Sequence, residues 1–273
     1  MPAAALAFAL AAAFVHALWN VLIARARDPE AATAVALIVA EIAFAPAAIA
    51  LWRVHAAAWP FIAGSGVFEL AYIVLLATAY RRVALSVVYP VARGVAPVLV
   101  LVIGIVALGA TATWGGVGGV LLVAAGVLLV RGLRNADKSG LAFGLAIAGT
   151  IAGYTLLDKH GVAHAGPLPY VEVMMLGPSL LYVTGFAKVR GLAAIRAEIG
   201  PATIVAGIAT FGAYALVLAA LQRASAAPVA AVRETSVVIA VGLAAVVLKE
   251  RVGPARLAGA VLVAGGVALL SLS

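Results

Sequence analysis

Residues 113–129 read TWGGVGGVLLVAAGVLL, and residues 253–269, which lie 140 positions later, read GPARLAGAVLVAGGVAL. Glycine, alanine, valine and leucine recur in both segments in a similar order. The same shift of 140 positions superposes Arg93 on Arg233. A fixed shift that aligns distant segments is typical of an internal repeat. The chain therefore consists of two related halves, and each carries one arginine at the matching place.

The composition is that of a membrane protein. The chain has 273 residues, of which 66% are apolar and 10% are charged, whereas an ordinary soluble domain has about 25% charged residues. Apolar runs of roughly 20 residues, the length that crosses a bilayer, recur with short polar breaks between them. The first run has no basic segment before it, so we expect a membrane helix there and not a cleaved signal peptide.

The breaks between apolar runs predict an all-α membrane protein with ten transmembrane helices. The first five are expected near residues 3–24, 31–52, 60–80, 84–108 and 112–131, and the second five near 139–158, 168–188, 201–221, 226–248 and 254–272. The polar linker RGLRNADKSG (131–140) separates two repeats, 1–136 and 137–273. Five helices per repeat would insert the second copy upside down. Such inverted repeats are typical of secondary transporters, which bind their substrate near the bilayer midplane at the repeat interface.

The basic residues predict the orientation. The breaks after the first, third, fifth, seventh and ninth helices contain thirteen Lys and Arg, and the opposite side contains three. The richer side is expected to be cytoplasmic, with both termini outside the cytoplasm. The net charge of +8 is scattered over these breaks, so nucleic acid is not an expected partner. The chain has no cysteine, which excludes disulfides and thiolate chemistry.

Three segments resemble one transporter family. They are VVLKERVGPARLAGAVLVAGGVALL (246–270), LWN (18–20) and ALQRASAAPVAAV (220–232). With the two five-helix repeats, they are similar to the EamA-type exporters of the drug/metabolite transporter superfamily, over essentially the whole chain. The resemblance implies efflux of small metabolites such as amino acids, without ATP. The first repeat departs from the pattern, because GATATWGG (109–116) stands in place of the Glu-Arg turn. The predicted outside termini also differ from the cytoplasmic termini that are common in the family.

Arg93 is the first candidate for a substrate-binding residue. It lies in the apolar stretch YPVARGVAPVLV (89–100), with Tyr89 one turn earlier on the same helical face. A charge at this depth is costly and by default functional, and a guanidinium can hold a carboxylate with two hydrogen bonds. The alternative is a structural ion pair with Glu69 or Glu41.

Arg233 and Glu234 are candidates in the second repeat. As neighbours on a helix they point about 100° apart, so each needs another partner. Arg233 is expected either to line the same cavity, as a weaker counterpart of Arg93, or to extend to the membrane surface.

Glu41 and Glu69 are the candidates to carry a coupling proton, because a bilayer disfavours the charged form of a carboxyl group. Glu69 shares a helical face with Tyr72, and either carboxylate could instead pair with Arg93. Glu41, in EIAFAP, has a counterpart in Glu172, in EVMMLGP, if one residue is inserted.

Polar and aromatic residues complete the candidate site. His16, Trp19 and Asn20 form one stripe on the first helix, and Tyr154 and Asp158 have a similar spacing in the sixth. His16 could be a packing residue, and Trp19 and Tyr214 could fill the core or stack on a substrate. The substrate-binding candidates are Arg93, Tyr89, Glu41, Glu69, Tyr72, Trp19, Asn20, His16, Arg233, Glu234, Tyr214 and Tyr154.

Two further motifs are interpreted as structural. HGVAH (160–164) has the spacing of a metal-binding pair but no third ligand and no zincin glutamate, so it is expected to be an ordinary loop. The glycine pairs in GGVGG (115–119), GLAFG (140–144) and GTIAG (149–153) predict close helix packing, or a dimer face.

The leading hypothesis is a secondary transporter in a bacterial-type inner membrane, working as a monomer or homodimer. It would export amino acids, including aromatic or hydrophobic ones, or related amphipathic solutes by alternating access. No catalytic residues, cofactor or metal are expected, and no P-loop occurs in the sequence. The alternatives are a membrane enzyme or assembly factor for lipid-linked substrates and an uncoupled channel or facilitator.

Overall fold

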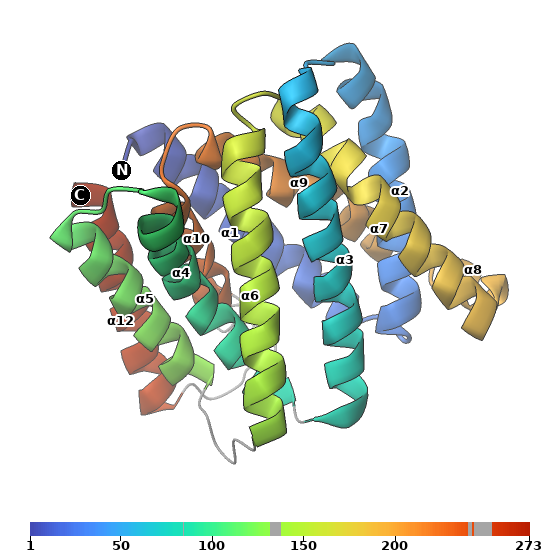
Figure 1. Ribbon diagram of the computed structural model, residues 1–273. Helices are drawn as coiled ribbons and strands as arrows, with labels where there is room; N and C mark the ends of the chain where they lie inside the picture. The colour runs from blue at the N-terminus through green and yellow to red at the C-terminus, as the bar shows by residue number, and fades with distance from the viewer. Residues whose placement is uncertain (84, 132–137, 240–241, 243–252) are drawn as a thin grey trace.

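The computed structural model describes residues 1–83, 85–131, 138–239, 242 and 253–273. Within these ranges the chain is helical, with one isolated β-bridge between Val54 and Ala165 and no strand. The first half contains α1 (Ala3–Ala24), α2 (Pro29–Ala50), the single turn η1 (Ala56–Ala58), α3 (Trp59–Arg82), α4 (Leu85–Leu108) and α5 (Trp114–Arg131). The second contains α6 (Lys138–Gly161), α7 (Pro167–Arg190), α8 (Leu192–Ala197), α9 (Pro201–Leu221), α10 (Ala226–Arg233) and α12 (Pro254–Leu272). Figure 1 shows these helices side by side as one bundle.

The all-helical prediction is confirmed. In the described part of the chain, eight helices are long and apolar enough to cross a membrane, namely α1, α2, α3, α4, α6, α7, α9 and α12. The apolar stretch of α5, Trp114–Val130, is shorter. The protein is therefore an integral membrane protein, and the count of ten crossings stays a prediction.

Helix starts follow from local sequence. Asp28 caps α2, since its Oδ1 accepts hydrogen bonds from the backbone N–H groups of Glu30 and Ala31 at 3.2 and 3.1 Å. Proline occupies the first turn of α2, α7, α9 and α12, where its missing N–H costs nothing. The break between α7 and α9 contains the short helix α8, which the sequence prediction did not include.

The predicted ninth helix, residues 226–248, is wrong as one continuous element. α10 ends at Arg233, Glu234 forms a turn, and the helix resumes over residues 235–239. The backbone N–H of Glu234 bonds to Ala231 O at 3.0 Å, and that of Val237 bonds to Glu234 O at 3.0 Å. Both bonds span three residues, as in a 3₁₀ turn. The LKER run at 248–251 lies outside the described residues.

α5 and α12, the equivalent last helices of the two halves, pack against each other (Figure 1). A Cβ added to Gly119 would lie 2.9 Å from Gly266 O, and one added to Gly266 would lie 2.8 Å from Gly119 O. Gly126 and Gly259 have the same reciprocal relation at 2.7 Å. These contacts run antiparallel and obey the 140-residue shift, which is the pattern that a two-fold axis perpendicular to both helices produces. The predicted close packing at 115–119 is confirmed.

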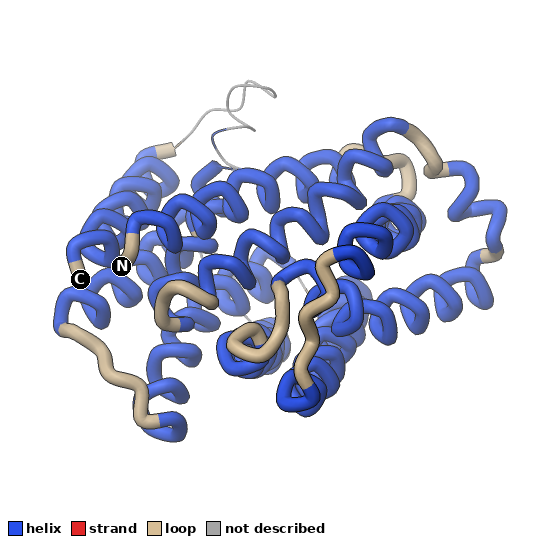
Figure 2. The backbone as a smooth tube through the Cα atoms, turned by 90° about the horizontal axis from the view of Figure 1, so that it is seen from above, coloured by secondary structure: helices blue, strands red, loops and turns tan. Residues whose placement is uncertain are grey.

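The other helix contacts follow the same two-fold relation, so that each contact has an equivalent with the two halves interchanged. α1 packs against α9 as α6 packs against α3, and α6 packs against α4 as α1 packs against α10, while α2 meets its counterpart α7. Gly144 lies against Val91 of α4 and Gly153 against Phe68 of α3, so close packing is confirmed at these glycines too. The interface between the halves is thus the interior of the bundle. The first and last residues meet at one end, where the Met1 amino group donates to Leu270 O and Ser273 O at 3.2 Å (Figure 2).

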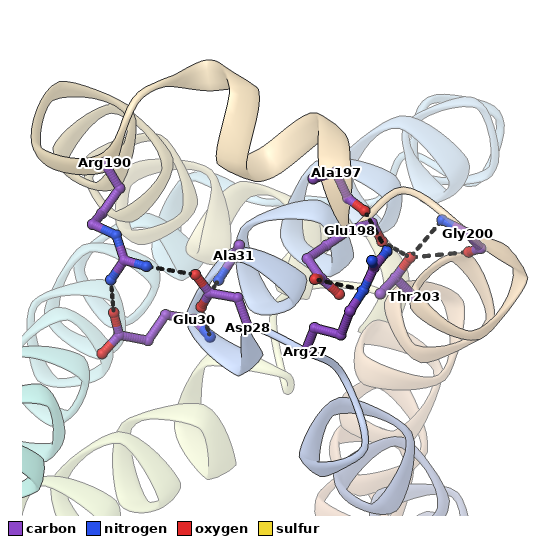
Figure 3. Close-up of polar contacts among 9 residues, drawn as sticks. All are labelled: Arg27, Asp28, Glu30, Ala31, Arg190, Ala197, Glu198, Gly200 and Thr203. Atoms are coloured by element: carbon purple, nitrogen blue, oxygen red, sulfur yellow. Dashed lines mark hydrogen bonds and ion pairs between the residues drawn. The ribbon is translucent and has the colours of Figure 1, made fainter.

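Loops join the halves at both ends of the bundle. At one end Arg190 pairs with Asp28 at 2.8 Å and with Glu30 at 3.9 Å, and Arg27 pairs with Glu198 at 3.8 Å (Figure 3). At the other end the contact is made by backbone, because the N–H of His55 bonds to His164 O at 3.0 Å and that of Gly166 bonds to Arg53 O at 2.8 Å. The repeat relation makes these two contacts equivalent, since each joins the first loop of one half to the second loop of the other.

Candidate functional site

Arg93 is buried in α4 and reaches across to the second half. Its Nε lies 3.0 Å from Oε2 of Glu234, and both side chains are almost fully enclosed. The predicted partners of Arg93 in a structural ion pair, Glu69 and Glu41, are therefore corrected to Glu234. The pair connects the two repeats at the point where the α10 helix is interrupted.

The remaining contacts of Arg93 come from three elements. Its Nη2 lies 3.2 Å from Nε2 of His16 on α1 and donates to Ser236 Oγ at 3.4 Å. The Tyr89 ring lies 5.9 Å from the guanidinium carbon, within range of a cation–π contact. His16 is thus a direct neighbour of the charge and not only a packing residue.

Arg233 has a different environment. It is 8% exposed, which contradicts the alternative that its side chain extends to the membrane surface. Its Nη2 donates to the Tyr154 hydroxyl at 3.5 Å, and its guanidinium carbon lies 5.9 Å from the Tyr154 ring and 5.7 Å from the Tyr214 ring. Among the described residues no carboxylate lies within 4 Å of it. The positive charge of Arg233 therefore lies next to two aromatic rings, those of Tyr154 and Tyr214.

A carboxyl group with three hydroxyl donors lies next to Arg233. Asp158 Oδ1 accepts from Ser65 at 2.6 Å and from Tyr170 at 3.0 Å, and its Oδ2 accepts from Tyr214 at 2.5 Å. The donors belong to α3, α7 and α9, so Asp158 joins four helices. Glu69, buried on α3, lies within electrostatic range of both Asp158 and Arg233.

Aromatic rings contact one another close to these charged groups. The Tyr72 and Tyr154 rings meet edge to face at 6.5 Å, and Tyr154 and Tyr214 are tilted at 6.2 Å. His16 and Trp19 meet edge to face at 5.0 Å. The Trp19 indole N–H is buried without a hydrogen-bond partner in the described structure, so it is available to donate a hydrogen bond to a ligand. Asn20 instead turns back to its own helix and donates to His16 O at 2.7 Å.

The structure brings most of the predicted residues together. One cluster, which we name the central site, contains His16, Glu69, Tyr72, Tyr89, Arg93, Tyr154, Tyr214, Arg233 and Glu234, with Trp19 beside it. Glu41 is separate from it: its neighbours are Ser179 and Glu172 at the contact of α2 with α7.

Sequence reasoning missed Ser65, Tyr170 and Ser236, and it noted Asp158 only for its spacing from Tyr154. Asp158 shares the helical face of Tyr154, a spacing that was visible, but its three donors come from helices distant in the sequence. Ser65, Tyr170 and Ser236 are ordinary polar residues with no local signal.

The histidines of HGVAH belong to a loop contact. The His160 and His164 rings stack on Phe61 at 5.9 and 6.3 Å, and His160 Nδ1 lies 2.8 Å from Leu156 O. Within the described ranges, no group of three or more His, Cys, Asp or Glu side chains is arranged to hold a metal.

The arrangement of two repeats around a buried charged centre agrees with the comparison with known families. The model of the EamA-like transporter family matches residues 3–132 and again residues 138–272. The chain belongs to the EamA-like transporter family. This EamA-like protein is therefore a membrane transporter of the drug/metabolite transporter superfamily, as the sequence resemblance predicted.

The fold is also found among solved structures. A protein of known crystal structure matches with a TM-score of 0.74 and 16% identity, covering 100% of this chain and 98% of the other. At this identity the match shows a common fold alone. No curated protein sequence matches the EamA-like chain.

Proposed function

We propose that this EamA-like protein is a secondary transporter that exports small metabolites, foremost amino acids and related amphipathic solutes, by alternating access. The observation that carries the proposal is the central site, where charges of both signs and aromatic rings from both repeats meet inside the bundle. A zwitterion needs both signs of charge, and an apolar or aromatic side chain needs the rings.

Each part of an amino acid has a matching group. Arg233 is the group proposed for the substrate carboxylate, because no described carboxylate lies within 4 Å of it and a guanidinium fork fits a carboxylate. Glu69 and Asp158, on the neighbouring helices, would attract the ammonium group. Tyr72, Tyr154 and Tyr214 would contact the side chain. Arg93, with Glu234, lines the same site and fixes the repeats next to it.

The proposed architecture is ten crossings in two inverted repeats, 1–136 and 137–273. The reciprocal glycine contacts of α5 and α12 support an axis in the membrane plane. The contact between the chain ends supports an even number of crossings. Movement of one repeat against the other would then expose the central site to each side in turn. We further propose a bacterial-type inner membrane, a monomer or homodimer, and no enzymatic activity.

Counterflow in proteoliposomes tests the function. Vesicles loaded with one unlabelled amino acid are diluted into the labelled form, and the panel includes nucleobases and cationic compounds. We expect saturable, transient accumulation for amino acids, and loss of it in the Arg233→Ala variant. Flux that never saturates would indicate a channel. Saturable exchange of nucleobases or cations alone would contradict the amino-acid assignment.

A further inference from the structure

The two arginines of the central site occupy equivalent positions on helices that pack against each other. The shift of 140 residues superposes Arg93 on Arg233, and with them RGVA (93–96) on RETS (233–236). These segments belong to α4 and to the interrupted helix that begins with α10, and α4 contacts α10. Each contact of one arginine with the other half can therefore be compared with the matching position near the other arginine.

The first helices of the halves show that the two-fold relation holds at the arginines. A shift of 138 residues superposes LWN (18–20) of α1 on LLD (156–158) of α6, and with it His16 on Tyr154. His16 Nε2 lies 3.2 Å from Nη2 of Arg93 in its own half, and the Tyr154 hydroxyl lies 3.5 Å from Nη2 of the arginine in the second half. The same position of the first helix thus contacts the arginine in both repeats.

The other two polar partners of Arg93 have no equivalent in the opposite direction. Glu234 Oε2 lies 3.0 Å from Arg93 Nε, and Ser236 Oγ accepts from Arg93 Nη2 at 3.4 Å. When the two halves are interchanged, the matching positions beside the second arginine are 94 and 96. These are Gly94 and Ala96, whose side chains have no hydrogen-bond acceptor. The repeats therefore differ at the two positions that neutralise and orient Arg93.

Position 96 lies on the side of α4 that faces the aromatic rings. Ala96 is 1% exposed and belongs to the same buried cluster as Tyr154, against which Tyr214 packs. Both of these rings lie within 6 Å of the Arg233 guanidinium, at 5.9 and 5.7 Å. A Cβ on Gly94 would lie 2.9 Å from a leucine side chain of α5, so close helix packing restricts that position to glycine.

Arg233 thus combines burial with the lack of an internal counter-ion. It is 8% exposed, and none of the ion pairs in the described ranges includes it. Arginine is almost never buried in proteins unless it is paired. The protein supplies a carboxylate to one of two equivalent arginines and leaves the second accessible only to a carboxylate that is not part of the chain.

We propose that Gly94 and Ala96 determine the specificity of Arg233 for the carboxylate of a solute. This carboxylate takes the place beside Arg233 that the Glu234 carboxylate takes beside Arg93, and the adjoining tyrosine rings contact an apolar or aromatic body. The ligand class is a monocarboxylate with an apolar tail, and an ammonium group is not required for binding. The inference rests on the proposed function for the access of solutes to the central site.

Binding of a simple carboxylate tests the proposal on the native protein. The probe is hydrocinnamate, a phenyl ring on a short carboxylate chain, and the control is its neutral amide. Thermal unfolding midpoints of the purified protein are measured in detergent over a range of probe concentrations. We expect hydrocinnamate to raise the midpoint with dose, because a ligand that binds only the folded state stabilises it, and the amide to have no effect. Equal effects of both compounds, no effect of either, or an equal effect of chloride would overturn the proposal.

Two variants of one size test whether charge at position 96 decides binding. Ala96→Asp supplies a carboxylate from α4, so the dissociation constant of hydrocinnamate should rise about tenfold or more, as expected when a charged hydrogen bond is replaced by an internal one. Ala96→Asn has the same shape without the charge and should retain most of the binding. Equal loss in both variants, or native binding in Ala96→Asp, would contradict the proposal. Where Ala96→Asp lowers the folded yield, the comparison of hydrocinnamate with its amide on the native protein still decides.

The converse variant gives Arg93 the neighbours that Arg233 has. Glu234→Gly/Ser236→Ala removes the internal carboxylate and hydroxyl, so acetate should raise the unfolding midpoint of this variant by more than it raises the native midpoint. Acetamide should raise neither. Equal stabilisation of both proteins by acetate would show that the matching positions are not equivalent, which contradicts the proposal.

Counterflow separates this inference from the proposed function. If hydrocinnamate binds but no solute of the panel shows counterflow, the proposed export function fails and the carboxylate site at Arg233 stands. If Ala96→Asp exchanges amino acids with native affinity, the export function stands and the role of position 96 fails.

Discussion

The two equivalent arginines have different partners, and this difference is the basis of the roles proposed for them. Arg93 lies 3.0 Å from a buried carboxylate, whereas Arg233 is surrounded by the Tyr154 and Tyr214 rings. The sequence hypothesis gave Arg93 the larger part in substrate binding and Arg233 the smaller. The contacts favour the opposite assignment, because a cation that already has its counter-ion gains less from a substrate carboxylate.

Substitution of the two arginines should therefore produce different defects. Arg233→Lys keeps the charge but loses the bidentate fork, so we expect solute affinity in counterflow to fall about tenfold or more with near-normal folded yield. Arg93→Ala removes one partner of a buried ion pair, which costs on the order of 3 to 5 kcal/mol, and should lower the detergent-solubilised yield.

The double variant Arg93→Ala/Glu234→Ala is the control, because it removes both charges and should recover part of the yield. Yield and affinity are measured on the same preparations. If Arg93→Ala has normal yield but reduced solute affinity, and Arg233→Lys has normal affinity, then Arg93 and not Arg233 binds the substrate carboxylate.

At the scale of elements, the closest helix contact is the crossing of α5 and α12. Gly266 lies in contact with Gly119 O, whereas a Cβ on the adjacent Gly265 meets nothing within 4 Å. Two neighbouring glycines in one helix thus differ only in what they face.

We expect Gly266→Ala to lower the thermal unfolding midpoint in detergent, since overpacking costs about 1 to 3 kcal/mol. Gly265→Ala should leave the midpoint unchanged or raise it slightly, because alanine favours a helix. Fluorescence-detected size exclusion after heating measures both variants. Equal midpoints would mean that α5 and α12 accommodate the added methyl group without loss of stability, and that the two helices are not tightly packed in solution.

Most helices could be predicted from the sequence, because apolar length and proline or polar breaks are local signals. The interruption at Glu234 could not, since no glycine or proline occurs at residues 229–239 and the turn coincides with a contact to Arg93 on another helix. The partners of the site residues could not be predicted for the same reason, because they lie on other helices. The 140-residue shift identified the two arginines as equivalents, but it carries no information on which carboxylate each one meets.

At the scale of the whole molecule, orientation is the property that the sequence predicts and the fold leaves open. Thirteen basic residues on one side against three on the other predict extracytoplasmic termini. An alkaline phosphatase fused to the C-terminus should be active and a fluorescent protein fused there dark. The opposite pair of results would establish cytoplasmic termini and exchange the predicted sides of every loop.

The two loop contacts that the repeat relation makes equivalent differ in how they respond to ionic strength. Arg190 and Asp28 form an ion pair with partly exposed side chains, and dissolved salt screens such pairs over a Debye length of about 8 Å at physiological strength. The His55–His164 and Gly166–Arg53 contacts are backbone hydrogen bonds without net charge, so salt leaves them largely intact. With the predicted orientation, the ion-paired face is turned to the cytoplasm, whose ionic strength is regulated, and the backbone-bonded face to surroundings whose salinity varies. A rise in external salt would then leave the backbone hydrogen bonds of the outer contact intact. Only a rise in salt inside the cell would weaken the Arg190–Asp28 ion pair.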